Sequence, residues 1–527
     1  MTVVRSALSA FVVAGMAMSW IGKPSSVTGT VRLADGSAAG GALVTFRATG
    51  YSTTVIADGD GRYSFDGLAD GTYEVAAGFG GVTGDATSVT VRGGGARADV
   101  VAASMPAGPD GLPASALLGL LPDGAEKRRF IRDCTGCHGL DARVAFPEGK
   151  ARTRESWVEK TALMLSFAGP SSNFPVIGAG REPEATADFL TRHVRDGASF
   201  GATPRADAAA AGATITEYAI PEPGDLPHDL AVLPDGRVVI TGMFTHRMYL
   251  LDPETGTFET EAIPVPNANP RAVELADDGA WWVVLGNPRA LARRDANSGE
   301  WTSWTVGTYP HSLGVARDGH VWFNGHFSRN PEILGSLDPA TGEVARLDVP
   351  AHPQAGEGAG PIPYELRVAP DGMIWGSELV GDRVFAYQPA NGQFQVWPMP
   401  GPVSGPRRLD VAPDGSVWIP EYAAGYLTRL DPANGFERFE VPVADAAPYI
   451  ARIDARTGRV WLGTGAADAI FAFDPASGRW TTYPLPSRAT MVRHLAIDRR
   501  NGDLWIAYGA SPGPPSKVAR LRVRTGS

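Results

Sequence analysis

Apolar and polar residues alternate with a period of two between residues 26 and 103, in runs such as VTGTVRLADG and GRYSFDGL. Glycine-rich and Asp-Gly turns separate these runs. Such alternation places one face of each strand in a core and the other in solvent. The segment 26–103 therefore predicts a small antiparallel β-sandwich, in which Tyr63, Phe65 and Tyr73 are expected to be core residues.

A helical pattern replaces the alternation between residues 104 and 200, in the runs ASALLGLL, GAEKRRFIRDC, RESWVEKTALMLSFAG and EPEATADFLTRHV. Thr153, and the acidic residues around Pro183, are typical of helix beginnings. We therefore expect a small all-α domain over residues 110–197. The alanine- and glycine-rich stretch 198–214 that follows has the composition of a linker.

A repeat occupies the rest of the chain, residues 215–527. An Asp-Gly turn or its counterpart recurs seven times, and a tryptophan follows six of these turns before a strand that ends in Asp-Pro or an equivalent. A period of about 40–45 residues with four short strands is typical of a β-propeller blade. We expect seven blades, closed by pairing of the strand Thr216–Pro221 with the last strand of the chain, Lys517–Val523. The predicted fold is thus multidomain and mainly β.

The first twenty residues, MTVVRSALSAFVVAGMAMSW, have one early arginine, a short apolar run and the small residues Ala17 and Ser19. This pattern predicts a signal peptide over residues 1–20, because the apolar run is shorter than the ~20 residues that span a bilayer. A periplasmic or otherwise exported bacterial protein is expected. The net charge of −10 argues against a nucleic acid or an anionic membrane as partner.

The only two cysteines of the chain, Cys134 and Cys137, stand with His138 in the run RDCTGCHGL. A disulfide here would close a very small loop, a zinc site would need a second pair of ligands, and a redox dithiol would adjoin a βαβ pattern. A c-type haem fits the helical surroundings and the export signal. Its vinyl groups would form thioethers with the two thiols, and His138 would be the proximal iron ligand.

Through CTGCHG and the two helices that follow, this segment resembles a class I-like cytochrome c domain. The resemblance implies a sixth iron ligand, most often a methionine, and Met164 is the only methionine between the motif and residue 198. Met164 could also be a core residue of its helix, with His193 as the ligand or with the sixth position open. Methionine ligation favours electron transfer, whereas an open position favours chemistry on small ligands.

One equivalent position of the seven repeats, next to the proline of the innermost strand, is always polar or ionisable. These residues are His228, Arg271, His311, Tyr364, Arg407, Tyr449 and Arg493. Because innermost strands line the channel of a propeller, we expect a ring around its mouth. The predicted catalytic residues are His228, His311, Tyr364 and Arg407.

Within this candidate site, the two histidines are expected to act as bases, and Arg271, Arg407 and Arg408 as clamps for an anion. Such His, Arg and Glu residues could instead form buried ion pairs that hold the blades together.

Two family resemblances cover the β regions. The spacing D-x-D-G-R-Y-x-F-x-x-L-x-x-G-x-Y-x-V resembles the carboxypeptidase regulatory-like, transthyretin-like module. PHDLAVLPDG, PHSLGVARDGHVWF and PRRLDVAPDGSVWIPE resemble the virginiamycin B lyase family of β-propellers. The second resemblance implies ring opening by elimination, with a Glu, His, Glu set that holds magnesium and supplies the base.

This chain departs from that lyase pattern, because no single blade carries the full set. Beside Pro310–His311, Tyr309 stands in place of the first glutamate and His326 in place of the second. Carboxylates occur instead at Glu378 and Glu421, in other blades. The lyase activity and its magnesium ion are therefore not expected to carry over directly.

The sequence as a whole predicts an exported monohaem c-type cytochrome joined to a β-propeller that binds a ligand or substrate. We expect an electron-transfer oxidoreductase that meets a redox partner protein or a small organic substrate. Two alternatives remain: a virginiamycin B lyase-like C–O lyase with a metal at the propeller face, and a non-catalytic binding module whose sandwich contacts a protein or glycan.

Overall fold

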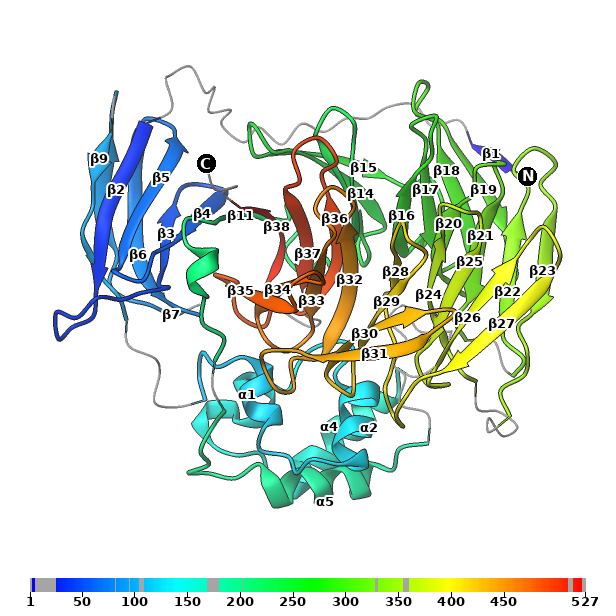
Figure 1. Ribbon diagram of the computed structural model, residues 1–527, viewed down its shortest axis with the longest axis horizontal. Coiled ribbons are helices and arrows are strands. Elements are labelled where there is room, and N and C mark those ends of the chain that lie inside the picture. Colours follow the sequence, from blue (N-terminus) through cyan, green and yellow to red (C-terminus); the bar gives the residue numbers. More distant parts are fainter. Residues whose placement is uncertain are drawn as a thin grey trace.

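The computed structural model describes residues 2–4, 25–80, 82–93, 95–103, 109–167, 180–201, 203–327, 330–353, 360–509 and 515–523. These residues form an N-terminal β-sandwich, a group of helices and a large set of propeller-like sheets (Figure 1). The protein is therefore multidomain and mainly β. None of the helices in these ranges is long and apolar enough to cross a membrane.

The predicted signal peptide lies outside the described residues, except for the strand β1 (Thr2–Val4), which pairs with a strand of the second propeller sheet.

The N-terminal sandwich consists of two sheets packed face to face. Its strands are β2 (Ser25–Arg32), β3 (Leu43–Arg47), β4 (Tyr51–Ile56), β5 (Arg62–Leu68), β6 (Gly71–Phe79), β7 (Val82–Thr83), β8 (Thr87–Val91), β9 (Ala96–Arg97) and β10 (Val100–Val101). One sheet has the order β10-β2-β5, and the other contains β4-β3-β6-β7. Tyr63 and Tyr73 are buried as predicted, whereas Phe65 is half-buried and stacks on Phe46 at 6.0 Å.

The helices lie together beside one end of the propeller sheets, at the bottom of Figure 1. They are α1 (Ala114–Leu118), α2 (Ala125–Cys134), α3 (Ala142–Ala145), α4 (Arg154–Leu165) and α5 (Pro183–His193), with the 3-10 turn η1 (Pro147–Gly149). A second 3-10 turn, η2 (Ala208–Ala210), contacts β35 instead. The Thr153 hydroxyl caps α4 by accepting from the Ser156 amide at 3.3 Å. The first long helix and the last meet through Phe130 and Phe189, whose rings are 6.5 Å apart.

Six propeller sheets follow one another along the chain, each with four antiparallel strands. The first two sheets are β12 (Pro227–Val232), β13 (Val238–Gly242), β14 (Arg247–Asp252) and β15 (Thr257–Ala262), and β16 (Pro270–Leu275), β17 (Trp281–Leu285), β18 (Ala290–Arg294) and β19 (Trp301–Thr305). The third and fourth sheets are β20 (Pro310–Val315), β21 (Val321–Gly325), β22 (Ile333–Leu337) and β23 (Val344–Asp348), and β24 (Pro363–Val368), β25 (Ile374–Glu378), β26 (Arg383–Gln388) and β27 (Gln393–Pro398). The fifth and sixth sheets are β28 (Asp410–Val411), β29 (Val417–Glu421), β30 (Tyr426–Asp431) and β31 (Gly435–Glu440), and β32 (Pro448–Asp454), β33 (Arg459–Thr464), β34 (Ala469–Asp474) and β35 (Arg479–Pro484).

The final propeller sheet combines both ends of the repeat region. Its strands β36 (Val492–Ile497), β37 (Leu504–Gly509) and β38 (Ser516–Arg522) are completed by β11 (Thr214–Ala219), which pairs with β38. The predicted exchange of the first strand into the last sheet is therefore present. The other edge of β11 pairs with β4 of the sandwich, so one sheet runs from the propeller into the N-terminal domain.

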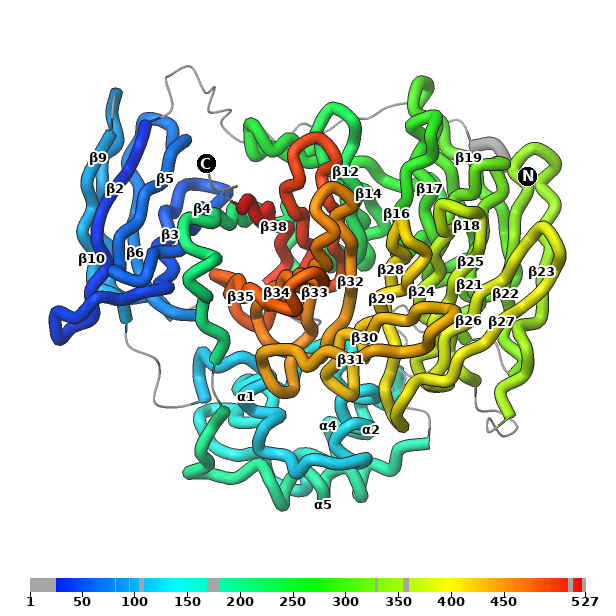
Figure 2. The backbone as a smooth tube through the Cα atoms, viewed as in Figure 1, coloured from blue at the N-terminus to red at the C-terminus, as the bar shows by residue number. Residues whose placement is uncertain are grey.

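The stretch 198–214, whose composition resembles a linker, packs against its neighbours. The Asp207 carboxylate accepts from the Thr482 amide at 2.6 Å, and Arg205 lies 4.4 Å from the ring centre of Phe79. Figure 2 shows this segment returning from the helices along the last sheets to β11. The segment that leaves the helical unit is therefore anchored on the last propeller sheets and the sandwich.

Removing the sandwich should destabilise the propeller, because it uncovers the edge of β11. A chain that begins at residue 109 is expected to unfold several degrees lower and to aggregate with rising concentration, since an unpaired strand edge recruits other strands. Thermal unfolding and light scattering measure both effects.

In that truncated chain, Thr216→Lys places a charge on the exposed edge and should reduce the aggregation. A monodisperse truncated protein of unchanged unfolding temperature would contradict this account.

Candidate functional site

A cavity of about 450 Å³ lies between the helical unit and the propeller face. From the helical unit, Cys134, Cys137, His138 and Met164 line it. From the propeller, its lining residues are His228, Arg271, His311, His326, Tyr364, Arg407 and Arg493. The cavity thus brings together the predicted haem-attachment motif and six members of the predicted ring, including all four predicted catalytic residues.

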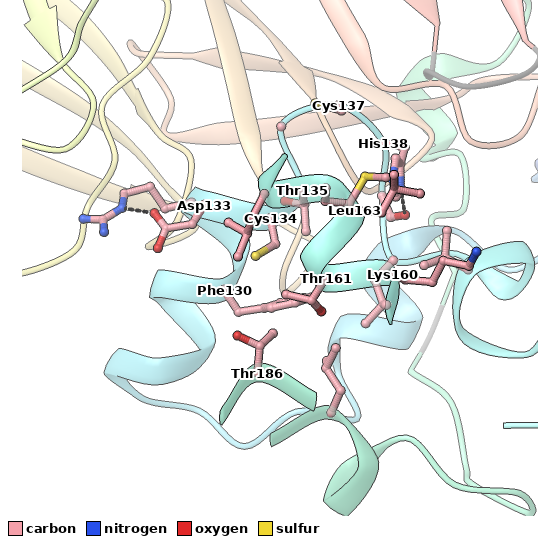
Figure 3. A pocket seen from close by; sticks show the side chains of 18 of the residues that line it. Phe130, Asp133, Cys134, Thr135, Cys137, His138, Lys160, Thr161, Leu163 and Thr186 are labelled. Carbon is pink, nitrogen blue, oxygen red and sulfur yellow. Dashed lines mark hydrogen bonds and ion pairs between the residues drawn. The ribbon is translucent and has the colours of Figure 1, made fainter. Parts of the chain in front are cut away.

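The two cysteines are free thiols at the end of α2 and in the loop that follows it. Figure 3 shows Cys134, Thr135 and Cys137 around this turn, beside Thr161 and Leu163 of the neighbouring helix α4. Burial raises the pKa of the Cys134 thiol to about 12 and that of Cys137 to about 11. Because thiolates are the reactive form of cysteine, this environment is unsuited to a redox dithiol.

The propeller holds the loop between the cysteines by hydrogen bonds to its backbone. Arg493 donates to the carbonyls of Gly136 and Cys137, at 2.8 and 2.7 Å. The Tyr422 hydroxyl donates to the Thr135 carbonyl at 2.7 Å. A Cβ at position 136 would lie 3.2 Å from Nη2 of Arg407, so the loop approaches this closely because the residue there is glycine.

Further contacts fix the helical unit over the propeller mouth. The buried ammonium of Lys127 lies 2.7 Å from the Asp445 carboxylate, and the Ser115 amide donates to the Ala466 carbonyl at 2.8 Å. His228 and His311 are each only 2% exposed as a result of this cover and of their inner position. The propeller wall of the cavity is therefore buried.

Three histidines of the propeller wall hold the same tautomer. Nδ1 of His311 donates to the Tyr364 carbonyl at 2.9 Å, and Nδ1 of His326 donates to the Pro363 carbonyl at 2.6 Å. Nδ1 of His228 donates to the Asp229 carboxylate at 2.7 Å. Because these oxygens can only accept, the hydrogen of each ring is on Nδ1 and Nε2 carries a lone pair.

The same three imidazoles are neutral. Burial lowers the pKa of His228 to about 3, although the hydrogen bond to Asp229 opposes the shift. Burial also lowers the pKa of His326 to about 3 and that of His311 well below its ordinary value. The ring centres of His228 and His311 are 5.7 Å apart, and those of His311 and His326 are 4.4 Å apart. The wall is thus a row of neutral nitrogen acceptors.

Arg407 and Arg408 differ in their surroundings although both are buried. Arg408 donates to both Asp229 oxygens, at 2.9 and 2.8 Å, and this ion pair takes it out of the predicted anion clamp. Arg407 donates to the Tyr364 hydroxyl at 2.9 Å and lies 3.7 Å from the ring centre of Tyr422. Sequence reasoning missed Tyr422, because it follows the end of β29 and lies outside the aligned position.

The remaining predicted residues occupy different places. Met164 is half-buried in α4 and lines the cavity, whereas His193 at the end of α5 does not. Tyr449 is fully buried behind Tyr364, with 2.5 Å between their hydroxyl oxygens. Within the described ranges, no three His, Cys, Asp or Glu side chains are grouped so that they could hold a metal ion.

Comparisons with known proteins agree with this architecture in two regions. Residues 349–512 match the model of the virginiamycin B lyase family, and residues 26–103 match the carboxypeptidase regulatory-like domain. A search of curated proteins found no match.

Solved structures of lyases share the propeller fold. Selenomethionine-substituted virginiamycin B lyase from Staphylococcus aureus has 17% identity and a TM-score of 0.52, over 59% of this chain and 100% of that chain. A streptogramin B lyase structure has 17% identity and a TM-score of 0.53, over 59% of this chain and 98% of that chain. This region is a virginiamycin B lyase-like β-propeller in fold.

Substituting Lys127 by Met should loosen the helical unit from the propeller. The change leaves the Asp445 carboxylate, 17% exposed, without its cation, at a cost of about 2–3 kcal/mol, because breaking a fully buried pair costs ~3–5 kcal/mol. Faster hydrogen exchange in residues 125–140 would report the loosening.

The matched control is Arg129→Met, which removes a half-exposed pair with Glu126 on the same helix. Equal exchange rates in the two variants would contradict a docking role for Lys127.

Proposed function

We propose that the protein is an exported electron-transfer oxidoreductase, a c-type cytochrome whose haem pocket is closed by a β-propeller. The observation that carries the proposal is the shared cavity, lined by Cys134, Cys137 and His138 on one side and by the propeller ring on the other. A redox partner protein or a small organic substrate would exchange electrons with the haem. Export is supported by the pattern of the first twenty residues.

The residues of the cavity fit a covalently attached haem. Both thiols are free, and Nδ1 of His138 lies 3.1 Å from the Gly139 carbonyl, so that Nε2 would serve as the iron ligand. The volume of about 450 Å³ falls in the range of about 300–1,000 Å³ that is usual for cofactor sites. When bound, a c-type haem supplies one-electron exchange.

The protein residues divide into three roles in this proposal. Phe130, Trp157 and Leu190 supply apolar walls and exclude water. Arg493 and Tyr422 position the attachment loop against the propeller. The ring residues set the polarity of the space beside the haem. There the histidines would act as bases and the arginines as clamps for an anion, as the sequence predicts.

The proposed domain organisation is a sandwich over 26–103, a cytochrome c domain over 110–197 and a seven-bladed propeller over 215–527. The inner strand of the first propeller sheet, β12, contacts the inner strands of the second and the last sheets, β16 and β36. This contact between the first and last sheets supports a closed ring.

Replacing both attachment cysteines should remove covalent haem, whereas replacing one should leave it held by a single thioether. With Cys134→Ser or Cys137→Ser, one thioether is lost, and with both changes no haem should stay with the chain after denaturation. Purification from a strain that matures c-type cytochromes, followed by haem staining of denatured protein and by optical spectra, measures this.

Thr135→Ser is the matched control within the loop, since it keeps the hydroxyl that lies 2.9 Å from the Tyr422 hydroxyl. A wild-type protein that carries no covalent haem under these conditions would refute the proposed function.

The match of residues 349–512 favours a second candidate, a lyase that opens the ring of a streptogramin B antibiotic. The helical unit argues against it, because it covers the propeller face, where His228 and His311 are each 2% exposed. We therefore expect no ring opening when virginiamycin B is incubated with the protein and followed by chromatography.

If the wild-type protein does open the ring and His311→Asn abolishes the reaction without changing the haem spectrum, the lyase function would replace the redox one.

A further inference from the structure

The propeller wall of the cavity contains three imidazole nitrogens that are open to a bound group. Nε2 of His228, His311 and His326 has no hydrogen-bond donor among the residues that the structure describes. Buried acceptors are normally satisfied, by protein, water or a bound group. The cavity is therefore where water, or a donor or metal ion of a bound group, can meet these nitrogens.

Each of the three rings also has the arrangement of a metal-ligating histidine. In such histidines one nitrogen binds the metal and the other donates to a carboxylate or a backbone carbonyl, which fixes the ring and raises its basicity. His311 and His326 donate to carbonyls, and His228 donates to Asp229. Nε2 of each ring is thus unprotonated and able to bind a metal, and the hydrogen bond of Nδ1 fixes the orientation of the ring.

The anchors of these rings are themselves rigid. Asp229 is held by two hydrogen bonds from Arg408, one to each carboxylate oxygen. The carbonyls of Pro363 and Tyr364 belong to the inner strand β24. The tautomers are therefore built into the propeller and do not depend on the helical unit.

The sequence points to Met164 as the sixth ligand, but its setting differs from that of the histidines. Met164 lies in the last turn of α4, next to Leu163, which is 45% exposed. The propeller histidines are almost fully buried in the wall of the same cavity. Burial and the anchoring hydrogen bonds therefore favour an imidazole over Met164 as the ligand.

We propose that the propeller supplies the sixth iron ligand of the haem, through Nε2 of one histidine of the group His228, His311 and His326. The inference rests on the proposed function, since His138 is taken as the proximal ligand. It makes the propeller part of the cytochrome itself: the helical unit alone would carry an incompletely ligated haem. One imidazole then ligates iron, and the other two line the space beside it.

The ligand pair of the wild-type holoprotein tests the proposal without any substitution. Two histidines give a low-spin spectrum without the sulfur-to-iron band, and near-infrared magnetic circular dichroism and electron paramagnetic resonance distinguish them from a His–Met pair. We expect the two-histidine signature, with no carbon monoxide binding to the reduced protein. A His–Met signature, or a high-spin haem that binds carbon monoxide readily, would overturn the inference.

Single substitutions identify the histidine. His228→Asn, His311→Asn and His326→Asn each keep an amide in place of Nδ1 and remove Nε2, so the anchoring hydrogen bond can persist. We expect one of the three to become high-spin and to bind carbon monoxide, and added imidazole to restore its low-spin spectrum. The other two should remain low-spin.

Met164→Leu and His193→Gln are the matched controls from the helical unit and should leave the spectrum unchanged. Conversion to high spin by Met164→Leu, with all three propeller variants unchanged, would refute the proposal. Because covalent haem is measured separately, a protein with attached haem and a His–Met pair refutes this inference and leaves the proposed function intact. A protein without covalent haem refutes both.

Discussion

The hydrogen bonds from Arg493 to the carbonyls of Gly136 and Cys137 are the contact on which the site depends. A guanidinium that is 2% exposed must find acceptors inside the protein, because an unsatisfied buried cation is costly. The turn between the cysteines offers two carbonyls that no helix uses. Arg493, on the inner strand of the last propeller sheet, and the loop between the cysteines thus satisfy each other's hydrogen-bonding groups. This fixes the position of the cysteines relative to the ring.

Chain connectivity supports the same arrangement. The helical unit follows the sandwich and precedes β11, and β11 pairs with both the sandwich and the last propeller sheet. Between them, residues 198–214 are held by contacts such as Asp207 with Thr482. The unit is therefore tethered at both ends near the sheet that carries Arg493, which reduces the conformational freedom lost when it docks.

Much of the architecture follows from local pattern alone. Period-two alternation predicted the sandwich strands, the repeat predicted the propeller-like sheets, and the orphan strand near residue 216 predicted the pairing of β11 with β38. A repeat places equivalent residues at equivalent positions of successive sheets. For this reason His228, His311, Tyr364 and Arg407 could be grouped from the sequence, and all four line one cavity.

The docking of the helical unit and the chemistry of the ring could not be predicted in this way. The contact of Arg493 with Cys137 joins residues 356 positions apart, and no spacing rule reaches that distance. Arg407 and Arg408 are adjacent and identical in type, yet only Arg408 meets a carboxylate. Whether a buried arginine is paired depends on the residues that the fold brings beside it, as Asp229 of the first sheet shows.

The charge of the ring separates this propeller from one that holds a divalent cation. The carboxylates that the sequence offers near the mouth are used in ion pairs: Glu378 pairs with Arg383, and Glu421 accepts from Nε of Arg438 at 2.9 Å. What faces the cavity instead is a set of neutral imidazoles among arginines. Magnesium prefers anionic oxygen ligands and would be repelled by the arginines, whereas the iron of a haem takes neutral imidazole ligands and brings its own anionic macrocycle. The electrostatics of the propeller mouth therefore favour a haem over a lyase-type metal ion.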